Sequence, residues 1–329
     1  MDRRGARAAL GAIALVALLV LPAGTAAKAK RKKGVKLPAV ITATSRATTS
    51  ADGQLVTPTA VCPPGTVALG GGFSGEIGRE EGSPTDLYVV YASRRNSPTS
   101  WQIGAVREDA GAKGNAISVT VAAYCQSPKL GKVRKPKRKR GKRASEAERR
   151  GKHRGHKHRK LIVSEVSSAG QAADTGERSS ATASCPEGLN AISGGYSVDP
   201  APILSMGLKF PLVWADHASS ARAWTAGETT SGSTPMTLTS YAYCANTSAP
   251  LALSGSGSVD PDATGSAATP PCPAKRPVIS GGFDNSPVTL GGAAELATES
   301  IGSGGGWTTS AYDLDTGAPA SLQGIAYCR

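Results

Sequence analysis

Stretches in which every second residue is hydrophobic or small recur along the chain and predict β-strands. Residues 118–125, 237–244 and 322–328 each show this alternation, and each ends at a cysteine. A period of two places alternate side chains on the same face of a strand. These three stretches are therefore expected to be half-buried strands.

Further strands are predicted in the region before the first of these stretches. Turn residues such as Pro63-Pro64-Gly65, Asn96-Ser97-Pro98 and Gly111-Ala112-Lys113-Gly114 separate the hydrophobic runs. The expected strands cover residues 39–44, 56–61, 67–72, 87–93 and 101–107. About six short strands in a segment of this size predict a small antiparallel β-sandwich.

One sequence pattern occurs three times. It consists of Cys-Pro, a Gly-Gly-aromatic triplet whose aromatic residue lies 11 positions after the cysteine, a tryptophan, and a closing Tyr-Cys. The tryptophans are Trp101, Trp224 and Trp307, and the second cysteine follows each by 24, 20 and 21 residues. We name residues 37–128 repeat 1, residues 161–248 repeat 2 and residues 249–329 repeat 3. The pattern predicts an all-β chain of three tandem small antiparallel β-sandwich-like modules, each with one disulfide.

The six cysteines are expected to pair within the repeats. Six cysteines allow 15 connectivities, but a threefold pattern favours Cys62–Cys125, Cys185–Cys244 and Cys272–Cys328. On the chain-entropy model each bond would stabilise its module by about 4 kcal/mol. A metal site is not expected, because no two cysteines are closer than 28 residues.

The N-terminus predicts export. Arg3, Arg4 and Arg7 precede an uncharged apolar run, residues 8–21, and Ala27 is a suitable cleavage position, so residues 1–27 are expected to form a signal peptide. The alternative is an uncut signal anchor, which a longer apolar run would favour. Export predicts a secreted, extracellular protein that meets oxidising conditions, with the cell surface as a further location.

Positive charge is concentrated in two tracts. The chain has 329 residues and a formal charge of +14, of which residues 129–160 carry +15, residues 28–36 carry +6 and the signal peptide +2, which leaves −9 for the rest. A segment with so many like charges and so few hydrophobic residues is expected to be a disordered basic linker. Its 17 Lys and Arg residues predict rapid cleavage by trypsin into fragments near 37–128 and 161–329.

The basic linker is the candidate binding segment. Its densest part is expected to bind anionic cell-envelope polymers or other polyanions weakly, through Lys135, Lys137, Arg138, Lys139, Arg140, Lys142 and Arg143. It contains no aromatic residue, so specific nucleic-acid binding is not expected. The alternative is a solvated spacer without a partner.

Two recurring features allow a structural or a functional interpretation. The three repeated tryptophans could stack on sugars, but a chain with 5% aromatic residues is expected to use them in its core. The Gly-Gly pairs could bind an anion, but a strand bulge or a close backbone approach is the preferred interpretation. Trp214 has no evident counterpart in repeats 1 and 3 and could mark a contact particular to repeat 2.

Few residues suggest catalysis or metal binding. His153, His156 and His158 lie in the basic linker, which leaves His217 alone in the repeats, and G-x-S-x-G and H-E-x-x-H motifs are absent. Asp260 and Asp262 resemble the start of a calcium loop, but Pro271 stands where the closing glutamate is needed. We expect a non-catalytic surface or envelope protein without cofactor or metal.

A secreted carbohydrate-binding protein or hydrolase that uses a cleft between modules is the alternative. The acidic pairs Glu80-Glu81 and Glu108-Asp109 are its candidate residues, and each occurs in one repeat only. Such an enzyme would need convergent carboxylates.

The repeated pattern resembles a repeat of uncharacterised secreted proteins of high-GC bacteria. The resemblance is carried by CPPGTVALGGGF, CPEGLNAISGGY and CPAKRPVISGGF together with the closing AAYC, YAYC and AYC. Repeat 3 departs from it at Lys275, where the other copies have Gly65 and Gly188. The resemblance implies an extracellular β module and no established activity.

Overall fold

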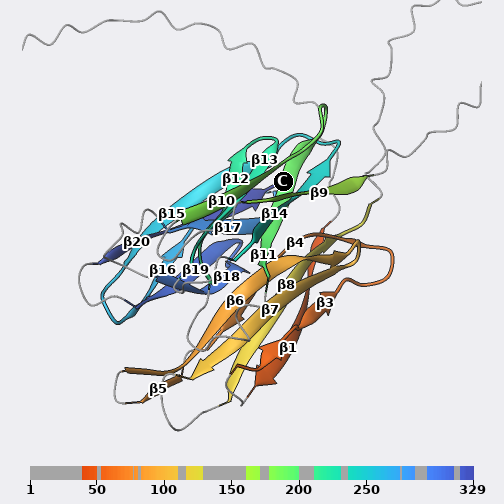
Figure 1. Cartoon of the computed structure of the whole chain (residues 1–329). Helices are drawn as coiled ribbons and strands as arrows, with labels where there is room; N and C mark the ends of the chain where they lie inside the picture. Colours follow the sequence, from red (N-terminus) through yellow and green to blue (C-terminus); the bar gives the residue numbers. More distant parts are fainter. Residues whose placement is uncertain are drawn as a thin grey trace, which may run out of the picture. The chain divides into compact units, whose positions relative to one another are not determined.

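All regular secondary structure in the described part of the chain is β-strand, and the strands form three antiparallel sheets (Figure 1). The structure is a computed structural model. It describes residues 39–49, 53–76, 78–80, 83–109, 116–128, 161–170, 178–199, 211–230, 236–274, 276–285, 295–314 and 319–329. The predicted all-β class is confirmed. The predicted signal peptide, N-terminal basic tract and basic linker lie outside the described residues.

Each sheet contains strands from two repeats. The first has the order β1 (Val40–Thr49), β8 (Ile117–Gln126), β4 (Val67–Gly75), β18 (Glu295–Ser303), β19 (Gly306–Asp313), β16 (Thr264–Ala268). The second has the order β10 (Arg178–Ser184), β13 (Ala223–Thr230), β12 (Pro211–Ser220), β17 (Val278–Asp284), β20 (Ala320–Cys328), β15 (Leu251–Val259). The third has the order β2 (Leu55–Val56), β7 (Ser100–Asp109), β6 (Ser83–Ser97), β11 (Asn190–Val198), β14 (Leu238–Ala245), β9 (Val163–Ala169), and β3 (Thr59–Val61) and β5 (Gly78–Glu80) are paired to β7 and β6.

This arrangement corrects one part of the sequence-based prediction. Self-contained sandwiches were expected, but every repeat divides its strands between two sheets, and every sheet is completed by a neighbouring repeat. The physical reason is that a half-sheet of three strands leaves an unpaired edge, which pairing with the next half-sheet satisfies. The described residues of the three repeats accordingly belong to one compact unit.

Three short strand pairings connect the repeats, and we call them seams. Seam 1–3 pairs β4 with β18, seam 1–2 pairs β6 with β11, and seam 2–3 pairs β12 with β17. Each brings the aromatic residue of a Gly-Gly-aromatic triplet opposite a polar residue of another repeat. The pairs are Phe73 with Ser300, Tyr196 with Ser93, and Phe283 with Asp216.

The main hydrophobic core includes side chains of all three repeats. In β8 the buried and half-buried positions alternate at the start of the strand, as the period of two predicts, and the end of the strand is buried on both faces. The predicted strands 67–72, 87–93 and 101–107 are confirmed and extended as β4, β6 and β7. The predicted strand 56–61 is instead divided at Thr57 and Pro58 into β2 and β3. The two faces of β8 are buried in different clusters, because Val121 and Cys125 belong to the main core whereas Ala122 and Tyr124 pack with Trp307.

The edges of neighbouring sheets lie against each other. β15 and β16 belong to different sheets, and a Cβ atom on Gly255 or Gly257 of β15 would overlap the carbonyl oxygen of Ala268 or Ser266 beside it. The glycines of the Ser-Gly-Ser-Gly run therefore permit this approach. Unpaired strand edges are a hazard for aggregation, and a neighbouring strand covers this one.

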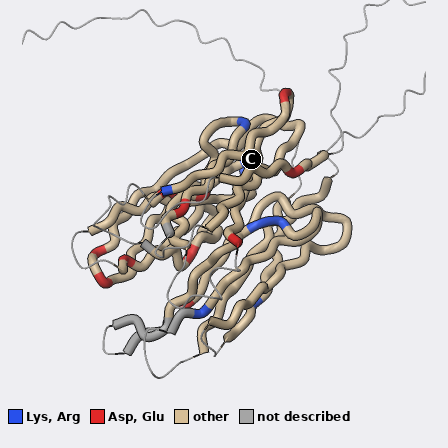
Figure 2. Tube along the Cα trace, viewed as in Figure 1, with Lys and Arg blue, Asp and Glu red and all other residues tan. Residues whose placement is uncertain are grey.

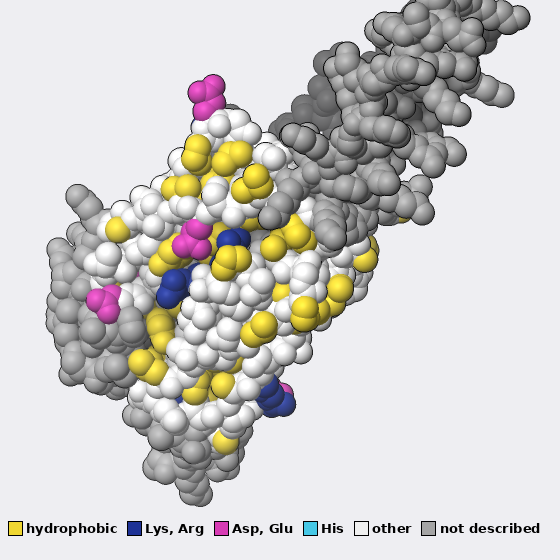
Figure 3. All heavy atoms as spheres, turned by 90° about the vertical axis from the view of Figure 1, so that its right-hand side faces the viewer, with side chains coloured by type: hydrophobic (Ala, Val, Ile, Leu, Met, Phe, Trp, Pro, Cys, Tyr) yellow, Lys and Arg dark blue, Asp and Glu magenta, His cyan; other side chains and the backbone are white. Residues whose placement is uncertain are grey.

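The described residues include few charged ones, and more of these are acidic than basic (Figure 2). Every lysine lies outside the described residues, which contain nine arginines and sixteen acidic residues. Hydrophobic side chains on the face drawn in Figure 3 are scattered among polar ones. This agrees with the expectation that the folded part is mildly acidic and that the basic charge lies in the tracts.

Candidate functional site: the seams and the connection that carries the basic tract

The three repeated tryptophans are core residues packed against glycine. Trp101, Trp224 and Trp307 are at most 1% exposed. A Cβ atom on the first glycine of the Gly-Gly pair in the same repeat would overlap the indole ring in each case; the glycines are Gly71, Gly194 and Gly281. The predicted core role is confirmed, and stacking of these rings on a sugar is incompatible with their burial.

The indole N–H of each tryptophan donates a hydrogen bond to the polar residue at a seam. Trp101 donates to Ser93 Oγ at 3.2 Å and Trp307 to Ser300 Oγ at 2.9 Å. In repeat 2 the acceptor is a carboxylate, because Trp224 donates to Asp216 Oδ1 at 2.5 Å. A buried indole N–H needs a hydrogen-bond acceptor. Ser93, Ser300 and Asp216 therefore each satisfy the indole N–H of the tryptophan in their own repeat.

The tyrosine that precedes the second cysteine completes the tryptophan site of a different repeat. The ring pairs are Tyr124–Trp307 and Tyr243–Trp101 at 5.4 Å between centroids, and Tyr327–Trp224 at 5.0 Å. Each tyrosine hydroxyl also accepts a backbone N–H of that other repeat, from Gly302 at 2.6 Å, Arg95 at 2.6 Å and Ala218 at 2.7 Å, respectively. The closing Tyr-Cys is thus an inter-repeat contact, which the sequence analysis did not detect.

The second glycine of each Gly-Gly pair lies against the backbone of the adjacent repeat. A Cβ atom on Gly72, Gly195 or Gly282 would overlap the carbonyl oxygen of Ser300, Ser93 or Asp216. A register shift precedes each pair, at Leu69, Ile192 and Ile279. Both preferred interpretations of the Gly-Gly pairs, a strand bulge and a close backbone approach, are therefore confirmed.

The bulged residues also connect the repeats through hydrogen bonds. Ser193 Oγ donates to the carbonyl of Leu69, and Ser280 Oγ donates to that of Ile192 at 3.1 Å. The third position of this set is Gly70, where a Cβ atom would overlap Ser280. Two serines and one glycine thus occupy equivalent positions, because the third position lacks space for a side chain.

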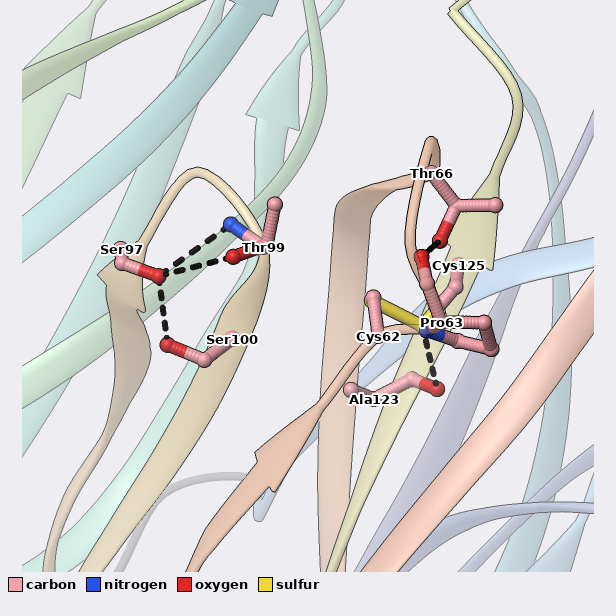
Figure 4. Close-up of a disulfide and its surroundings, with 8 residues drawn as sticks. All are labelled: Cys62, Pro63, Thr66, Ser97, Thr99, Ser100, Ala123 and Cys125. Carbon is pink, nitrogen blue, oxygen red and sulfur yellow. Dashed lines mark hydrogen bonds between the residues drawn. A yellow bond between two sulfur atoms is a disulfide. The ribbon is translucent and has the colours of Figure 1, made fainter.

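The disulfides pair as predicted, and each connects two sheets. The bonds are Cys62–Cys125, Cys185–Cys244 and Cys272–Cys328, and the described residues contain no free cysteine. Cys62 follows β3 of the third sheet, whereas Cys125 lies in β8 of the first sheet (Figure 4). The turn after Cys62 is closed by the Thr66 hydroxyl, which donates to the carbonyl of Pro63 at 2.6 Å.

Two buried carboxyl groups lie in repeat 2. Burial raises the pKa of Asp216 to about 7, although the hydrogen bond from Trp224 opposes the shift. Burial also raises the pKa of Glu228 on β13 to about 7, and Ser179 Oγ donates to its Oε1 at 3.2 Å. The other oxygen of Glu228 is buried and lacks a hydrogen-bond partner in the part of the chain that the structure describes. Both groups therefore resist ionisation.

Trp214 has a counterpart in repeat 1, which corrects the sequence analysis. It is the bulged residue of β12, and its ring occupies the space beside Gly227, just as Tyr91 of β6 lies beside Gly104. The guanidinium of Arg178 lies over the Trp214 ring, 5.1 Å from its centroid. The partly exposed indole is therefore covered by an arginine on one face.

The candidate catalytic residues do not assemble into a reactive group within the described residues. His217 Nε2 lies 3.8 Å from Asp284 Oδ2, but its Nδ1 lies 3.2 Å from the carbonyl of Ala218, so neither nitrogen is directed at a nucleophile. Asp262 accepts a hydrogen bond from the Tyr312 hydroxyl. No group of three or more His, Cys, Asp or Glu side chains that could hold a metal occurs in the described ranges.

The remaining predicted site residues are not described. Glu81, the histidines His153, His156 and His158, and the basic residues Lys135, Lys137, Arg138, Lys139, Arg140, Lys142 and Arg143 lie outside the described residues. The backbones of Glu80, Glu108 and Asp109 belong to β5 and β7. Their side chains are likewise outside the described part.

The ends of the basic linker meet in the structure. The backbone N–H of Leu161 donates to the carbonyl of Pro128 at 2.8 Å. The linker occupies the connection from β8 to β9, where 36 residues separate Gln126 from Val163. The corresponding connection from β14 to β15 needs only five residues, 246–250. The basic linker is thus an insertion in a short connection.

Comparison with other proteins adds no assignment. No family model matches the chain, and no curated protein is significantly similar to it. A search of the described residues found no helix that is long and apolar enough to cross a membrane.

Proposed function

We propose that the protein is an exported, non-catalytic protein of the cell surface or envelope, and that its basic tracts hold it weakly to anionic polymers. The observation that carries the proposal is the position of the basic linker. A charge of +15 is inserted in a connection that needs five residues elsewhere in the same unit. The fold does not need these residues to connect its strands. We therefore infer that the function of the linker depends on its charge.

Electrostatic attraction would reside in the tracts rather than in the folded unit. Lysine and arginine side chains on an extended chain bind polyanions largely by releasing condensed counterions, with little preference for sequence. The described residues carry an excess of acidic over basic side chains. The folded unit would therefore add little to the attraction and would be held away from the polymer.

Both basic tracts join the folded unit at neighbouring positions. Val40, which follows the N-terminal tract, pairs with Gln126, two residues before Pro128. Leu161, which follows the second tract, is hydrogen-bonded to Pro128. Two charged segments attached at one place act at a high effective concentration toward the same polymer, which supports joint binding.

Export is supported by the disulfides. Three disulfides are typical of a protein that folds under oxidising conditions outside the cytosol. Residues 1–27 supply the corresponding signal peptide in this proposal. The alternative, a sugar-binding protein or hydrolase with a cleft between modules, has less support, because buried Trp–Tyr pairs fill the contacts between the repeats.

The proposal is tested with three forms of the mature protein. These are the full chain, a chain in which a Gly-Ser linker of a few residues replaces residues 129–160, and a chain of unchanged length in which every Lys and Arg of 129–160 is replaced by Gln. Retention on beads coated with a phosphate-rich polymer is measured from low salt to about 0.5 M salt, with neutral dextran beads as control. We expect retention of the full chain to fall steeply with salt. Both variants keep residues 28–36 as their remaining basic tract, so they should be retained more weakly than the full chain and elute at a lower salt concentration. Equal retention of the Gln-substituted chain and the full chain, or retention that does not depend on salt, would reject the electrostatic role.

A further inference from the structure

Seam 2–3 contains an ionisable group at a position where the other two seams have a hydroxyl. Asp216, Ser93 and Ser300 each accept the indole N–H of the tryptophan in their own repeat. Each also lies opposite the aromatic residue of another repeat, which is Phe283 for Asp216. The carboxyl group is 94% buried. The same structural role is thus filled by a side chain that can acquire a charge.

Within the described residues, no cationic side chain neutralises that charge. Among residues whose side chains the structure describes, the ionisable ones on the strands packed against β12 are Tyr196 on β11, Glu228 on β13, Asp284 on β17, Glu299 on β18, and Tyr88, Tyr91, Arg94 and Arg95 on β6. Tyr327 on β20 reaches β12 through its hydrogen bond with Ala218. The two arginines lie over the rings of Tyr241 and Tyr243 instead. On β12 itself, His217 is paired with Asp284.

The neighbouring tyrosines respond to the carboxylate. Burial, followed by the negative charge of Asp216, raises the pKa of Tyr196. Burial and the charges of Asp216 and Asp284 raise the pKa of Tyr327, whose hydroxyl accepts the backbone N–H of Ala218 across the seam. Acidic groups on both sides of the seam are therefore close enough to disfavour a second negative charge.

We propose that seam 2–3 is a pH-dependent joint, in which ionisation of Asp216 weakens the pairing of β12 with β17 while seams 1–2 and 1–3 keep their strength. Protonated Asp216 is neutral and still accepts the Trp224 N–H, as a serine does. Ionised Asp216 places an uncompensated charge between two repeats, and opening of the seam exposes that charge to water. The proposal does not depend on whether the basic tracts bind polyanions.

The pH window follows from the direction of the pKa shift. Burial raises the pKa of Asp216 from 3.8 to about 7, so the folded seam favours the protonated form. The contribution to the strength of the seam is complete below pH 3.8 and is lost progressively as the pH rises to about 7. An exported protein would thus have a closed seam in acid surroundings and a looser seam above neutral pH.

Hydrogen exchange at individual backbone amides tests the joint, using the full mature chain with its disulfides intact. Protection factors are corrected for the intrinsic pH dependence of exchange and measured at about pH 5 and pH 8. The amides of β12 and β17 report on seam 2–3, and those of β4 and β18 report on seam 1–3. We expect protection of the first set to fall at least about tenfold between the two pH values relative to the second set. The upper limit over this pH range is about a hundredfold, because the pKa of Asp216 is raised from 3.8 to about 7.

Two variants and one control locate the effect. Asp216→Asn keeps an oxygen acceptor for Trp224 without a charge, and Asp216→Ser introduces the residue type that the other two seams have. At least one of these variants is expected to fold. In that variant, seam 2–3 should show the same pH dependence of protection as seam 1–3. Glu228→Gln, on the adjacent strand, is the matched control and should leave the seam-specific difference in place. Equal pH dependence at seams 2–3 and 1–3 of the unmodified chain would overturn the proposal. A difference that persists in both Asp216 variants, or disappears in Glu228→Gln, would also overturn it.

Discussion

The backbone N–H of Leu161 donates a hydrogen bond to the carbonyl oxygen of Pro128 at 2.8 Å. The 32 residues of the basic linker therefore leave and re-enter the folded unit at one place. This relationship changes the expected role of the linker. The sequence predicts a linker between repeat 1 and repeats 2 and 3, and the shared sheets hold these repeats together without it.

Replacement of residues 129–160 by two to four Gly-Ser residues should leave the protein folded and slightly more stable. The equivalent connection spans five residues, and shortening a 36-residue connection to that length lowers the entropy cost of loop closure by about 1–2 kcal/mol. Urea unfolding monitored by tryptophan fluorescence measures the change. The Gln-substituted chain of full length is the control, because it removes the charge but retains the loop. A variant that fails to fold would show that the linker contributes contacts to the fold.

Trypsin cleavage in the linker should give two fragments that stay associated. Repeat 1 pairs with repeat 3 through β4–β18 and with repeat 2 through β6–β11, and neither pairing involves the linker. Size-exclusion chromatography of the nicked protein should show one species with the retention of the intact fold, and two bands should appear after denaturing electrophoresis. Separate elution of the fragments in native buffer would contradict the shared sheets.

The strands, the disulfide pairing and the buried tryptophans could be predicted from the sequence because each depends on a local pattern or on the threefold spacing. The partner of Tyr124 could not be predicted, since the repeat pattern alone does not distinguish Trp101 of its own repeat from Trp307 of another. The importance of Asp216 was missed for a different reason. Ser93, Asp216 and Ser300 accept the indole N–H of tryptophans that follow them by 8, 8 and 7 residues. This shared spacing can be recognised only when Asp216 is compared with Ser93 and Ser300.

Gly194→Ala should destabilise the protein strongly. The new methyl group would overlap the indole ring of Trp224, a buried side chain whose N–H is fixed by Asp216. Overpacking of a core typically costs about 1–3 kcal/mol and occasionally more, and the fixed indole ring places this site at the upper end of that range. Gly65→Ala is the control, because a Cβ atom there meets open space and only the positive φ of 80° is unfavourable, at about 1 kcal/mol. Urea unfolding should rank the two variants in this order, and equal losses would contradict the packing argument.

Tyr243→Phe should weaken the contact between repeats 1 and 2. The hydroxyl of Tyr243 accepts the buried backbone N–H of Arg95 at 2.6 Å, and phenylalanine keeps the ring contact with Trp101 but leaves that donor unsatisfied. The expected loss of unfolding free energy is about 1–3 kcal/mol. Tyr241→Phe is the control, because its partly buried hydroxyl bonds to Ser197 at 3.0 Å and should contribute less. A larger loss for Tyr241→Phe would show that the inter-repeat bond is not the stronger one.

Glu228→Gln should stabilise the protein above neutral pH and have little effect in acid. Burial raises the pKa of Glu228 from 4.5 to about 7, so the folded state favours the neutral carboxyl and stability falls as the pH rises between these values. A pKa difference of one corresponds to 1.36 kcal/mol, so ionisation of Glu228 lowers the free energy of unfolding by at most about 3 kcal/mol at pH 8. The neutral amide of glutamine avoids this cost. Its oxygen can still accept the hydrogen bond from the Ser179 hydroxyl. Urea unfolding at pH 4 and pH 8 should give similar free energies for the two proteins at the lower pH and a higher value for Glu228→Gln at the upper pH. Glu187→Gln, on an exposed turn, is the control and should not change this difference. A stability gain of Glu228→Gln that is the same at both pH values would show that packing, and not the charge of Glu228, is responsible.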